Sequence, residues 1–526
     1  MRCMMTVSPM RNGCGTQQNP IVRGVSLYHS MFDQGHVVQD LLSRTYEGTG
    51  TGADPFMVQW ASNDPADPHC FSRARRWVFT IILALSTLSV ALASSAYTGA
   101  VPQLVEEYGI SSTTAYLGVT LFVMCFAVGP LLWASLSEIL GRQAVFIGTF
   151  AAFTAFNVGA ACSHNIPTLL LCRFFAGAFG SSSLVNTGGV IADLFPPEER
   201  NTPMSIFTAS LFFGPTLGPI IGSFIGMTEG WRWIQGFIAV MSGVLWIAGS
   251  LIIPETYSPV LLRRRAQILS AQTGKQYRSK LEETQSPHAV LVKTALVRPW
   301  LLLTFEPVVL LISIYLAIVY GILYLLFAAF PLVYHEMRGW TAGIATLPFL
   351  AVLVGMVFGV AYSFLHDHRR ARAISHSADK TTTAEQRLHP AMVGAVAIPL
   401  GLFTFAWTNF PSVHFIVSCI GTALFGFGLV CIFISMSHYL VDSYSIFAAS
   451  SLAASSVFRS VLGAVFPLFT PRMYETLGIR WASSVPAFLA LACIPIPFLL
   501  QRHGPWLRSK CRYMIEAREA TRVIRS

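Results

Sequence analysis

Twelve stretches of mostly apolar residues dominate this sequence of 526 residues. An α-helix needs about 20 such residues to cross the hydrocarbon core of a bilayer, and each stretch is long enough to do so. Apolar residues make up 53% of the chain and charged residues 11%, against roughly 25% charged residues in an ordinary globular domain. A water-soluble fold could not hide so much apolar surface. The sequence therefore predicts an all-α protein embedded in a lipid bilayer.

The predicted spans form two groups of six, separated by the polar stretch 254–300. The approximate spans are 77–100, 115–136, 144–162, 167–191, 203–227, 233–253, 303–330, 342–365, 391–408, 414–438, 446–469 and 481–500. This order predicts two pseudo-symmetric six-helix bundles that hold a substrate between them near the midplane. We expect a disordered cytosolic tail over 1–72, bundles over 73–253 and 301–500, a cytosolic loop over 254–300, and a cytosolic tail over 501–526.

The positive charges predict the orientation of the spans. Of the 35 lysine and arginine residues, 29 fall in segments that lie on the same side of the bilayer as the N-terminus, and four fall in segments on the opposite side. By the positive-inside rule, both termini lie in the cytosol. No basic patch is interleaved with aromatic residues, so the net charge of +10 does not indicate nucleic-acid binding. The scattered cysteines predict no metal site and no disulfide framework.

The end of the second span carries a charged motif, GPLLWASLSEILGRQ, over residues 129–143. Glu138 and Arg142 lie four residues apart, a spacing at which opposite charges meet on a helix or in a tight turn. Such a pair can bind a neighbouring helix end in one conformation and release it in another. Asp193 and Arg200 flank the turn into the fifth span. Alternatively, these are topology charges and solvated loop charges.

Arg173 lies inside the fourth span, in the stretch LLLCRFFAGAFGS. An arginine within the membrane is costly unless it faces a polar cavity or a partner. Gly177 and Gly180 follow it and would let helices close around the side chain. The alternative is a structural arginine bonded to backbone carbonyls.

A stripe of glycines runs along the fifth span, LFFGPTLGPIIGSFIG, with one glycine every four residues. Another helix can approach such a stripe at backbone distance and rock against it, although glycine stripes also occur as inert packing. Prolines between the glycines remove backbone donors and favour kinks. The residues are Gly214, Pro215, Gly218, Pro219, Gly222 and Gly226.

Together these three motifs resemble the major facilitator superfamily, and the stripe resembles its antiporter motif. Gln143 stands where the family usually has a second basic residue, so the charge cluster is thinner here. The stretches WRWIQGF (231–237), PETYSPVLLRRRA (254–266) and RGWTAG (338–343) are similar to those of fungal twelve-span drug:proton antiporters. Within that family, the nearest likeness is to cercosporin-type toxin exporters.

The resemblance implies the two-bundle fold and efflux of drugs, fungal toxins or polyamines driven by inward proton flow. It also implies that Arg173 takes part in proton coupling and that Asp193 joins Glu138 and Arg142 in a cytosolic gate. Proton coupling needs a group that can change charge, and Glu306, followed by Pro307 at an expected helix break, is our candidate for a proton or cationic-substrate site. An interfacial acid favoured by the helix dipole is an equal alternative.

Aromatic residues of the seventh span are the candidates for substrate binding. Tyr320, Tyr324 and Phe327 share one side of a helix, and their faces suit flat or cationic lipophilic molecules. Packing or lipid contact is the other interpretation of such a stripe. Further polar anchors would be Tyr97, Asn186, His438 and Arg459.

The sequence thus predicts a monomeric secondary-active exporter of a lipophilic small molecule in the plasma membrane, with the vacuolar membrane as the alternative. It would use a proton gradient and no cofactor. No GxxxxGK[ST] phosphate loop is present, which excludes a pump of that ATP-driven kind, and no enzyme motif is found. A polyamine or nutrient carrier and a non-transporting solute receptor remain alternatives. The few carboxylates in the spans disfavour a polyamine carrier.

Overall fold

The computed structural model describes residues 41, 44, 46–52, 54–60, 64, 66–196, 199–279, 288–376, 384–410, 412–444, 447–511 and 513–514. Within these ranges, eleven helical segments are long and apolar enough to cross a membrane. The last one, Ala448–Gly504, has 57 residues and would measure about 85 Å, nearly three bilayer cores. Its backbone turns at Gly478 (φ 70°, ψ 164°). It therefore crosses twice, and twelve crossings result.

The first half of the chain supplies six crossings. They are α3 (Arg73–Ala96), α5 (Ser112–Leu140), α6 (Arg142–Ala161), α7 (Ile166–Gly180) continued by α8 (Ser183–Leu194), α9 (Asn201–Glu229) and α10 (Trp231–Ile252). α3 leads through the short 3-10 turn η3 (Tyr97–Ala100) into α4 (Val101–Tyr108). Gly141 and Gly230 have φ values of 100° and 90°. Because glycine adopts positive φ at little cost, each allows an abrupt turn between two crossings.

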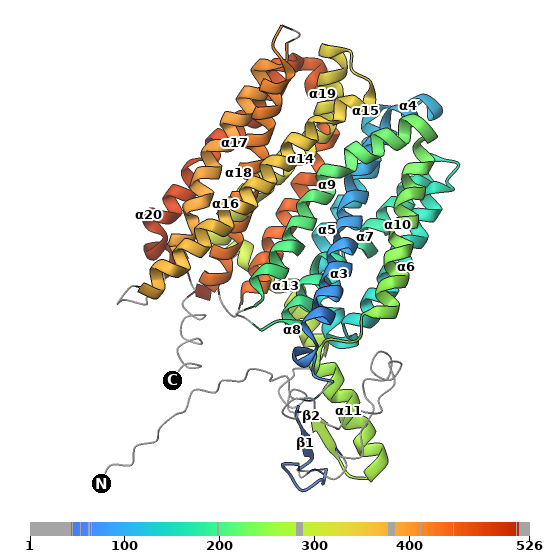
Figure 1. Cartoon of the computed structure of the whole chain (residues 1–526), viewed down its shortest axis with the longest axis vertical. Coiled ribbons are helices and arrows are strands. Elements are labelled where there is room, and N and C mark those ends of the chain that lie inside the picture. Colours follow the sequence, from blue (N-terminus) through green and yellow to red (C-terminus); the bar gives the residue numbers. More distant parts are fainter. Residues whose placement is uncertain are drawn as a thin grey trace.

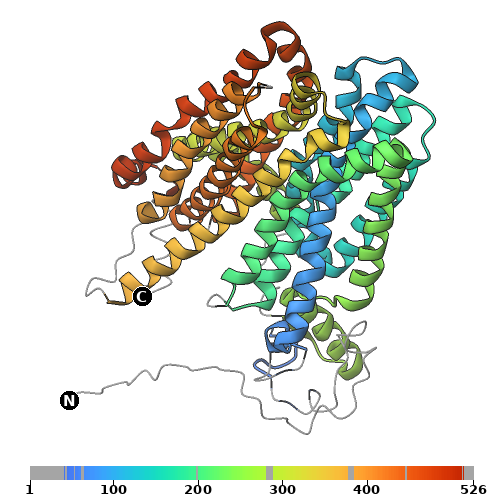
Figure 2. The ribbon, with the colours of Figure 1, turned by 45° about the horizontal axis from the view of Figure 1, so that its top comes forward.

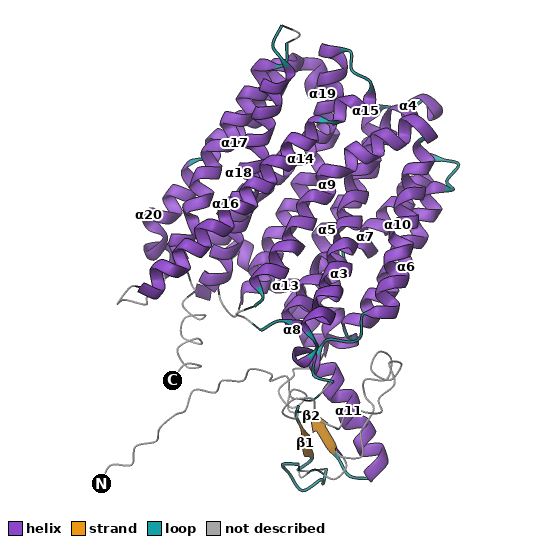
Figure 3. Cartoon of the chain, in the orientation of Figure 1, coloured by secondary structure: helices purple, strands orange, loops and turns teal. Residues whose placement is uncertain are grey.

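The second half repeats this arrangement. Its crossings are α14 (Pro307–Arg338), α16 (Pro348–His376), α17 (His389–Thr408), α18 (Phe415–Tyr444), and α19 (Ala448–Cys493) with α20 (Pro495–Lys510). Shorter elements are α13 (His288–Phe305), α15 (Ala342–Thr346) and η4 (Ala384–Leu388). In Figure 3, both halves consist of helices joined by short loops, and the strands lie only at the linker in the part of the chain described. The predicted all-α membrane fold is confirmed.

The two halves stand side by side (Figures 1 and 2). α3, α5 and α9 of the first half face α14, α16 and α19 of the second, and the broadest contact between the halves joins α5 to α19. We call the end from which α3 starts the linker end. It lies at the bottom of Figure 1, whereas α4 and α15 lie at the far end, at the top.

A small module lies at the linker end, built from α11 (Ser258–Thr273), β1 (Phe56–Val58) and β2 (Tyr277–Ser279). The two strands pair in parallel. Val58, Leu262 and Leu269 share its apolar core. Arg265 donates to the carboxylate of Asp64 at 2.6 Å, and both side chains are buried.

This module corrects the prediction of a disordered tail over 1–72. Described residues of that segment, Tyr46, Phe56, Val58 and Trp60 among them, pack against the linker between the halves, and the 3-10 turn η2 (Pro68–Cys70) contacts α8. The sequence predicted disorder because the segment has too few apolar residues to form a core alone. The residues that complete this core lie on α11 and β2, much later in the chain. Residues 1–40 and 515–526, which the two tail predictions include, lie outside the described residues.

Candidate functional site

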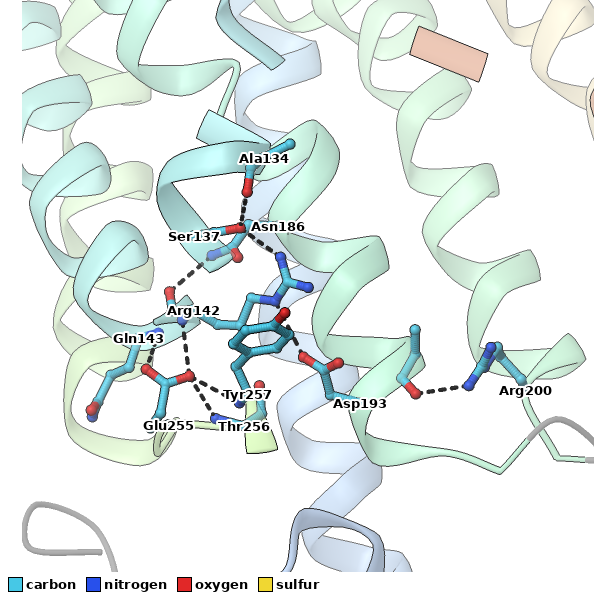
Figure 4. A network of polar contacts seen from close by, with 11 residues as sticks. Ala134, Ser137, Arg142, Gln143, Asn186, Asp193, Arg200, Glu255, Thr256 and Tyr257 are labelled. Carbon is cyan, nitrogen blue, oxygen red and sulfur yellow. Dashed lines mark hydrogen bonds and ion pairs between the residues drawn. The ribbon is translucent and has the colours of Figure 1, made fainter. Parts of the chain in front are cut away.

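A network of polar contacts joins α5, α6, α8 and the segment after α10 at the linker end (Figure 4). Its centre is Arg142, the first residue of α6. The Arg142 Nε donates to Asp193 Oδ2 at 3.2 Å and its Nη1 to Ser137 Oγ at 2.5 Å. The guanidinium also lies 4.9 Å from the ring centroid of Tyr257. One side chain therefore ties α8 and the end of α5 to the start of α6.

The carboxylate of Glu255 caps the N-terminus of α6. Glu255 is fully buried and accepts hydrogen bonds from the backbone N–H groups of Arg142 and Gln143 at 2.9 and 3.2 Å. It also accepts from Thr256 and Tyr257, at 3.0 Å each. A negative charge here satisfies free helix donors and complements the helix dipole.

Two glycines leave room for these charges. A Cβ atom on Gly141 would lie 2.1 Å from Glu255 Oε2, and its φ of 100° also disfavours any other residue. A Cβ atom on Gly189 of α8 would lie 2.6 Å from Arg142 Cζ. The network therefore depends on small residues as well as on charged ones.

The structure brings two of the three predicted gate residues together. Arg142 meets Asp193, but Glu138 is exposed and makes no ion pair with Arg142 among the described residues. The expected Glu138–Arg142 contact is wrong because α5 ends at Leu140 and Gly141 turns the chain. The helical four-residue spacing does not hold across that turn.

For three other residues of the network, the sequence either predicted a different role or predicted none. Asn186, a predicted substrate anchor, donates to the backbone carbonyl of Arg142 at 3.0 Å. Arg200 donates to the carbonyl of Ala192 at 2.8 Å and so holds the turn after α8. Glu255 was not predicted as part of a site. The sequence feature that could have indicated it is its position directly after the sixth span, in the stretch PETY.

A second charge cluster lies at the linker end of the other half. Arg387 of η4 pairs with Asp442 of α18 at 2.5 Å. His438 Nδ1 lies 3.9 Å from Asp367 Oδ2 of α16. The structure therefore places His438 in this cluster and not beside the other predicted substrate residues.

Arg173 is fully enclosed by backbone and aromatic groups. It donates to the carbonyl oxygens of Ala93 at 3.0 Å and Gly118 at 3.2 Å. Its Cζ lies 4.2 Å from the ring centroid of Phe122 and 4.8 Å from that of Tyr97. These contacts fit the alternative interpretation, in which Arg173 is a structural arginine bonded to backbone carbonyls. A role in proton coupling stays a prediction.

The predicted substrate residues of α14 lie at the contact between the halves. The ring centroids of Tyr320, Tyr324 and Phe327 follow one another at 4.9 Å. The hydroxyl of Tyr324 lies 2.7 Å from Ser94 Oγ of α3. Arg459 of α19 stands 5.2 Å from the Tyr320 ring centroid. One hydrogen bond thus joins the aromatic cluster to the part of α3 beside Arg173.

The glycine stripe of α9 packs on α3 within the first half. A Cβ atom on Gly214 would lie 2.5 Å from Ala91 Cβ, on Gly218 2.0 Å from Ser95 Oγ, and on Gly222 2.1 Å from the carbonyl oxygen of Ala96. Pro215 and Pro219 lie inside α9, which stays one helix. The stripe therefore allows backbone-distance packing, as its spacing predicted.

Glu306 lies at the expected helix break, in a non-helical conformation between α13 and α14. It is fully buried. Its carboxylate accepts from the Tyr444 hydroxyl at 3.0 Å and from the Tyr513 backbone N–H at 2.9 Å. Burial also raises the pKa of the nearby Cys511 thiol to about 12. Glu306 is thus a covered carboxylate at the linker end, away from the aromatic cluster.

Two six-helix halves that meet across polar and aromatic side chains, with charged networks at one end, define a secondary membrane transporter. The sequence profile of the Major Facilitator Superfamily matches residues 83–467. The chain belongs to this superfamily.

Similar proteins come from fungi. The chain is 52% identical to "Major facilitator superfamily multidrug transporter mdrA" of Aspergillus fumigatus, over 93% of this chain and 81% of the relative. It is 46% identical to "Efflux pump FUB11" of Gibberella moniliformis, over 93% and 83%. It is 47% identical to "Major facilitator-type transporter sorT" of Penicillium rubens, over 91% and 92%.

Among solved structures, the chain resembles the proton:xylose symporter XylE bound to 6-bromo-6-deoxy-D-glucose, with a TM-score of 0.58. The match covers 82% of this chain and 96% of that chain at 14% identity. At this identity the likeness concerns the fold alone.

Proposed function

We propose that this protein is a plasma-membrane efflux transporter that exports a lipophilic small molecule, such as a drug or a fungal secondary metabolite, by antiport with protons. Its relatives at 46–52% identity include proteins named multidrug transporter and efflux pump. The observation that carries the proposal is the aromatic cluster of α14, which lies at the contact between the halves and is hydrogen-bonded across it.

Transport requires this contact to open. The hydrogen bond between Ser94 and Tyr324 must break, as must the one from Thr120 Oγ1 of α5 to the Ala464 carbonyl of α19, at 2.7 Å. A lipophilic substrate would replace these contacts with contacts to the aromatic rings. The aromatic cluster would thus exchange protein contacts for substrate contacts in each cycle.

Protons would act at the linker end. Protonation of Asp193 would remove the charge that holds the Arg142 guanidinium and would loosen the tie between α6 and α8. Protonation of Glu306 would weaken its hold on Tyr444 and on the backbone at Tyr513. Either step links proton binding to the helix ends that have to move.

The test of function uses inside-out plasma-membrane vesicles from an efflux-deficient yeast that expresses the full chain. We expect ATP-energised vesicles, acidified by the host proton pump, to accumulate at least one lipophilic dye of a panel, and a protonophore to abolish this accumulation. No accumulation of any dye would contradict efflux, and accumulation insensitive to the protonophore would contradict proton antiport.

Arg173→Ala tests the buried arginine in the same vesicles. We expect accumulation to fall at least tenfold, because the tie between α7, α3 and α5 is lost, while the amount of protein in the membrane stays the same. Arg480→Ala is the matched control, since Arg480 stacks on Phe410 at the far end, 4.2 Å from the ring centroid. Unchanged transport by Arg173→Ala would refute its role.

The Glu306 hypothesis has its own test. Glu306→Gln keeps the size of the side chain but cannot change its charge, so we expect loss of uptake driven by a pH gradient and retention of substrate exchange without a gradient. Glu138→Gln, at an exposed position, should change neither. Uptake by Glu306→Gln that still follows the pH gradient would exclude Glu306 as the coupling group.

A further inference from the structure

Two arginines, one from each half, approach the same tyrosine at the contact between the halves. They are Arg173 of α7 and Arg459 of α19, and the hydroxyl of Tyr320, beside Arg459, donates to that of Tyr324 at 3.4 Å. On one side, Arg173 binds the carbonyl of Ala93, next to Ser94, whose hydroxyl contacts that of Tyr324. On the other side, Arg459 stands over the ring of Tyr320. The contact therefore concentrates positive charge.

No carboxylate compensates this charge. Among the described residues, neither arginine has an Asp or Glu oxygen within 4.0 Å, whereas Arg142, Arg265 and Arg387 all do. Aromatic faces supply part of the stabilisation: Arg459 Cζ lies 4.9 Å from the ring centroid of Phe433. Rings attract a cation but do not neutralise it, so an anion would still be bound favourably here.

The two arginines differ in access, although each keeps one nitrogen without a hydrogen-bond partner among the described residues, Nη2 of Arg173 and Nε of Arg459. Arg173 is fully buried, but Arg459 is only partly buried. The Nε of Arg459 is buried while the halves are in contact and has no hydrogen-bond partner among the described residues, and Nη2 makes a long bond of 3.3 Å to Ser456 Oγ. A guanidinium with free donors on one edge is suited to two parallel bonds with a carboxylate. Arg459 is the more exposed of the two, so it is the arginine that a substrate would reach first when the contact between the halves opens.

We propose that Arg459 binds the anionic group of the transported substrate, and that the protein therefore exports lipophilic organic acids. The substrate would carry a carboxylate or phenolate on an aromatic or apolar body. The anionic group would bind the Nε edge of Arg459, and the body would lie against Tyr320 and Phe433. This inference rests on the proposed efflux function and adds the charge of the substrate to it.

The experiment compares two dyes with the same xanthene body in the inside-out vesicles described above. Fluorescein is an anion with a free carboxylate, and rhodamine 6G is a cation whose carboxylate is esterified. We expect the full chain to accumulate fluorescein in preference to rhodamine 6G. Arg459→Gln should lower the ratio of fluorescein to rhodamine 6G accumulation at least tenfold, and Arg459→Lys should lower it less.

A second measurement needs no variant. With the unaltered chain, 2-naphthoate should compete with fluorescein, and its methyl ester, which has the same body without the charge, should compete at least tenfold more weakly. Equal competition by acid and ester would overturn the inference, and so would accumulation of rhodamine 6G without fluorescein. In both cases efflux itself would stand. Failure to accumulate either dye, or any other of the panel, would instead contradict the proposed function.

Discussion

Gly188 and Gly189 follow each other on α8, but only one of them borders a charge. A Cβ atom on Gly189 would lie 2.6 Å from Arg142 Cζ, whereas one on Gly188 would meet Phe207 at 3.6 Å, an ordinary contact. We expect Gly189→Ala to displace the guanidinium from Asp193 and to lower vesicle transport at least tenfold. Gly188→Ala should keep more than half of the transport. Equal behaviour of the two variants would contradict the central role of Arg142 in the network.

Glu255 and Glu138 provide a second comparison between single residues. Glu255 holds four backbone N–H groups and is buried, whereas Glu138 is exposed. A hydrogen bond to a charged group contributes about 1.5–3 kcal/mol. Glu255→Gln keeps one acceptor oxygen for the three N–H groups bound by Oε1 but loses the Oε2 acceptor of the Gln143 N–H, so it should destabilise the protein by about 1.5–3 kcal/mol. The apparent melting temperature of the purified full chain in detergent should fall by several degrees, and it should not change for Glu138→Gln. The opposite order would show that the exposed acid is the structural one.

At the scale of elements, the contact of α9 with α3 depends on the glycines of α9, which have no side chain to keep the two backbones apart. On Gly222 an added Cβ would lie 2.1 Å from the backbone oxygen of Ala96, and a backbone atom cannot move aside as a flexible side chain can. Overpacking of this kind costs about 1–3 kcal/mol. Gly222→Ala should therefore lower both the melting temperature and the transport rate. Gly243→Ala on α10 is the control, since its Cβ would meet Thr154 at 3.5 Å; an equal loss there would show a general intolerance of alanine.

The elements also show what the sequence could predict. The twelve crossings were predictable because each is a local run of apolar residues, and the close packing of α9 because the four-residue glycine spacing is local too. The Glu138–Arg142 contact failed because a turn at Gly141 interrupts the helix. The capping by Glu255 and the β1–β2 pair depend on residues far apart in the chain, and no local pattern records such partners.

At the scale of the whole molecule, the positions of the predicted site residues follow from how the halves meet. Tyr320, Tyr324 and Arg459 come together because α14 and α19 both face the first half. Tyr97 instead lies beside Arg173 within the first half. His438 and Asn186 lie on helices of the same bundles but at the linker end, in the two charge networks. A residue's span can be predicted from sequence, whereas its depth and its facing direction depend on the packing of both halves.

The contact between α5 and α19 should open in every transport cycle, and a covalent link across it should therefore stop transport. Thr120 Oγ1 lies 2.7 Å from the Ala464 carbonyl, and both residues are small. In a background without the native cysteines, we expect oxidation of the Thr120→Cys, Ala464→Cys pair to abolish vesicle transport and reduction to restore it. The control is Thr154→Cys with Ser242→Cys, which links α6 to α10 within one half, where the side-chain oxygens lie 3.1 Å apart. That link should leave transport unchanged, because the halves move as units. Full transport with the α5–α19 link formed would mean that these two helices do not separate.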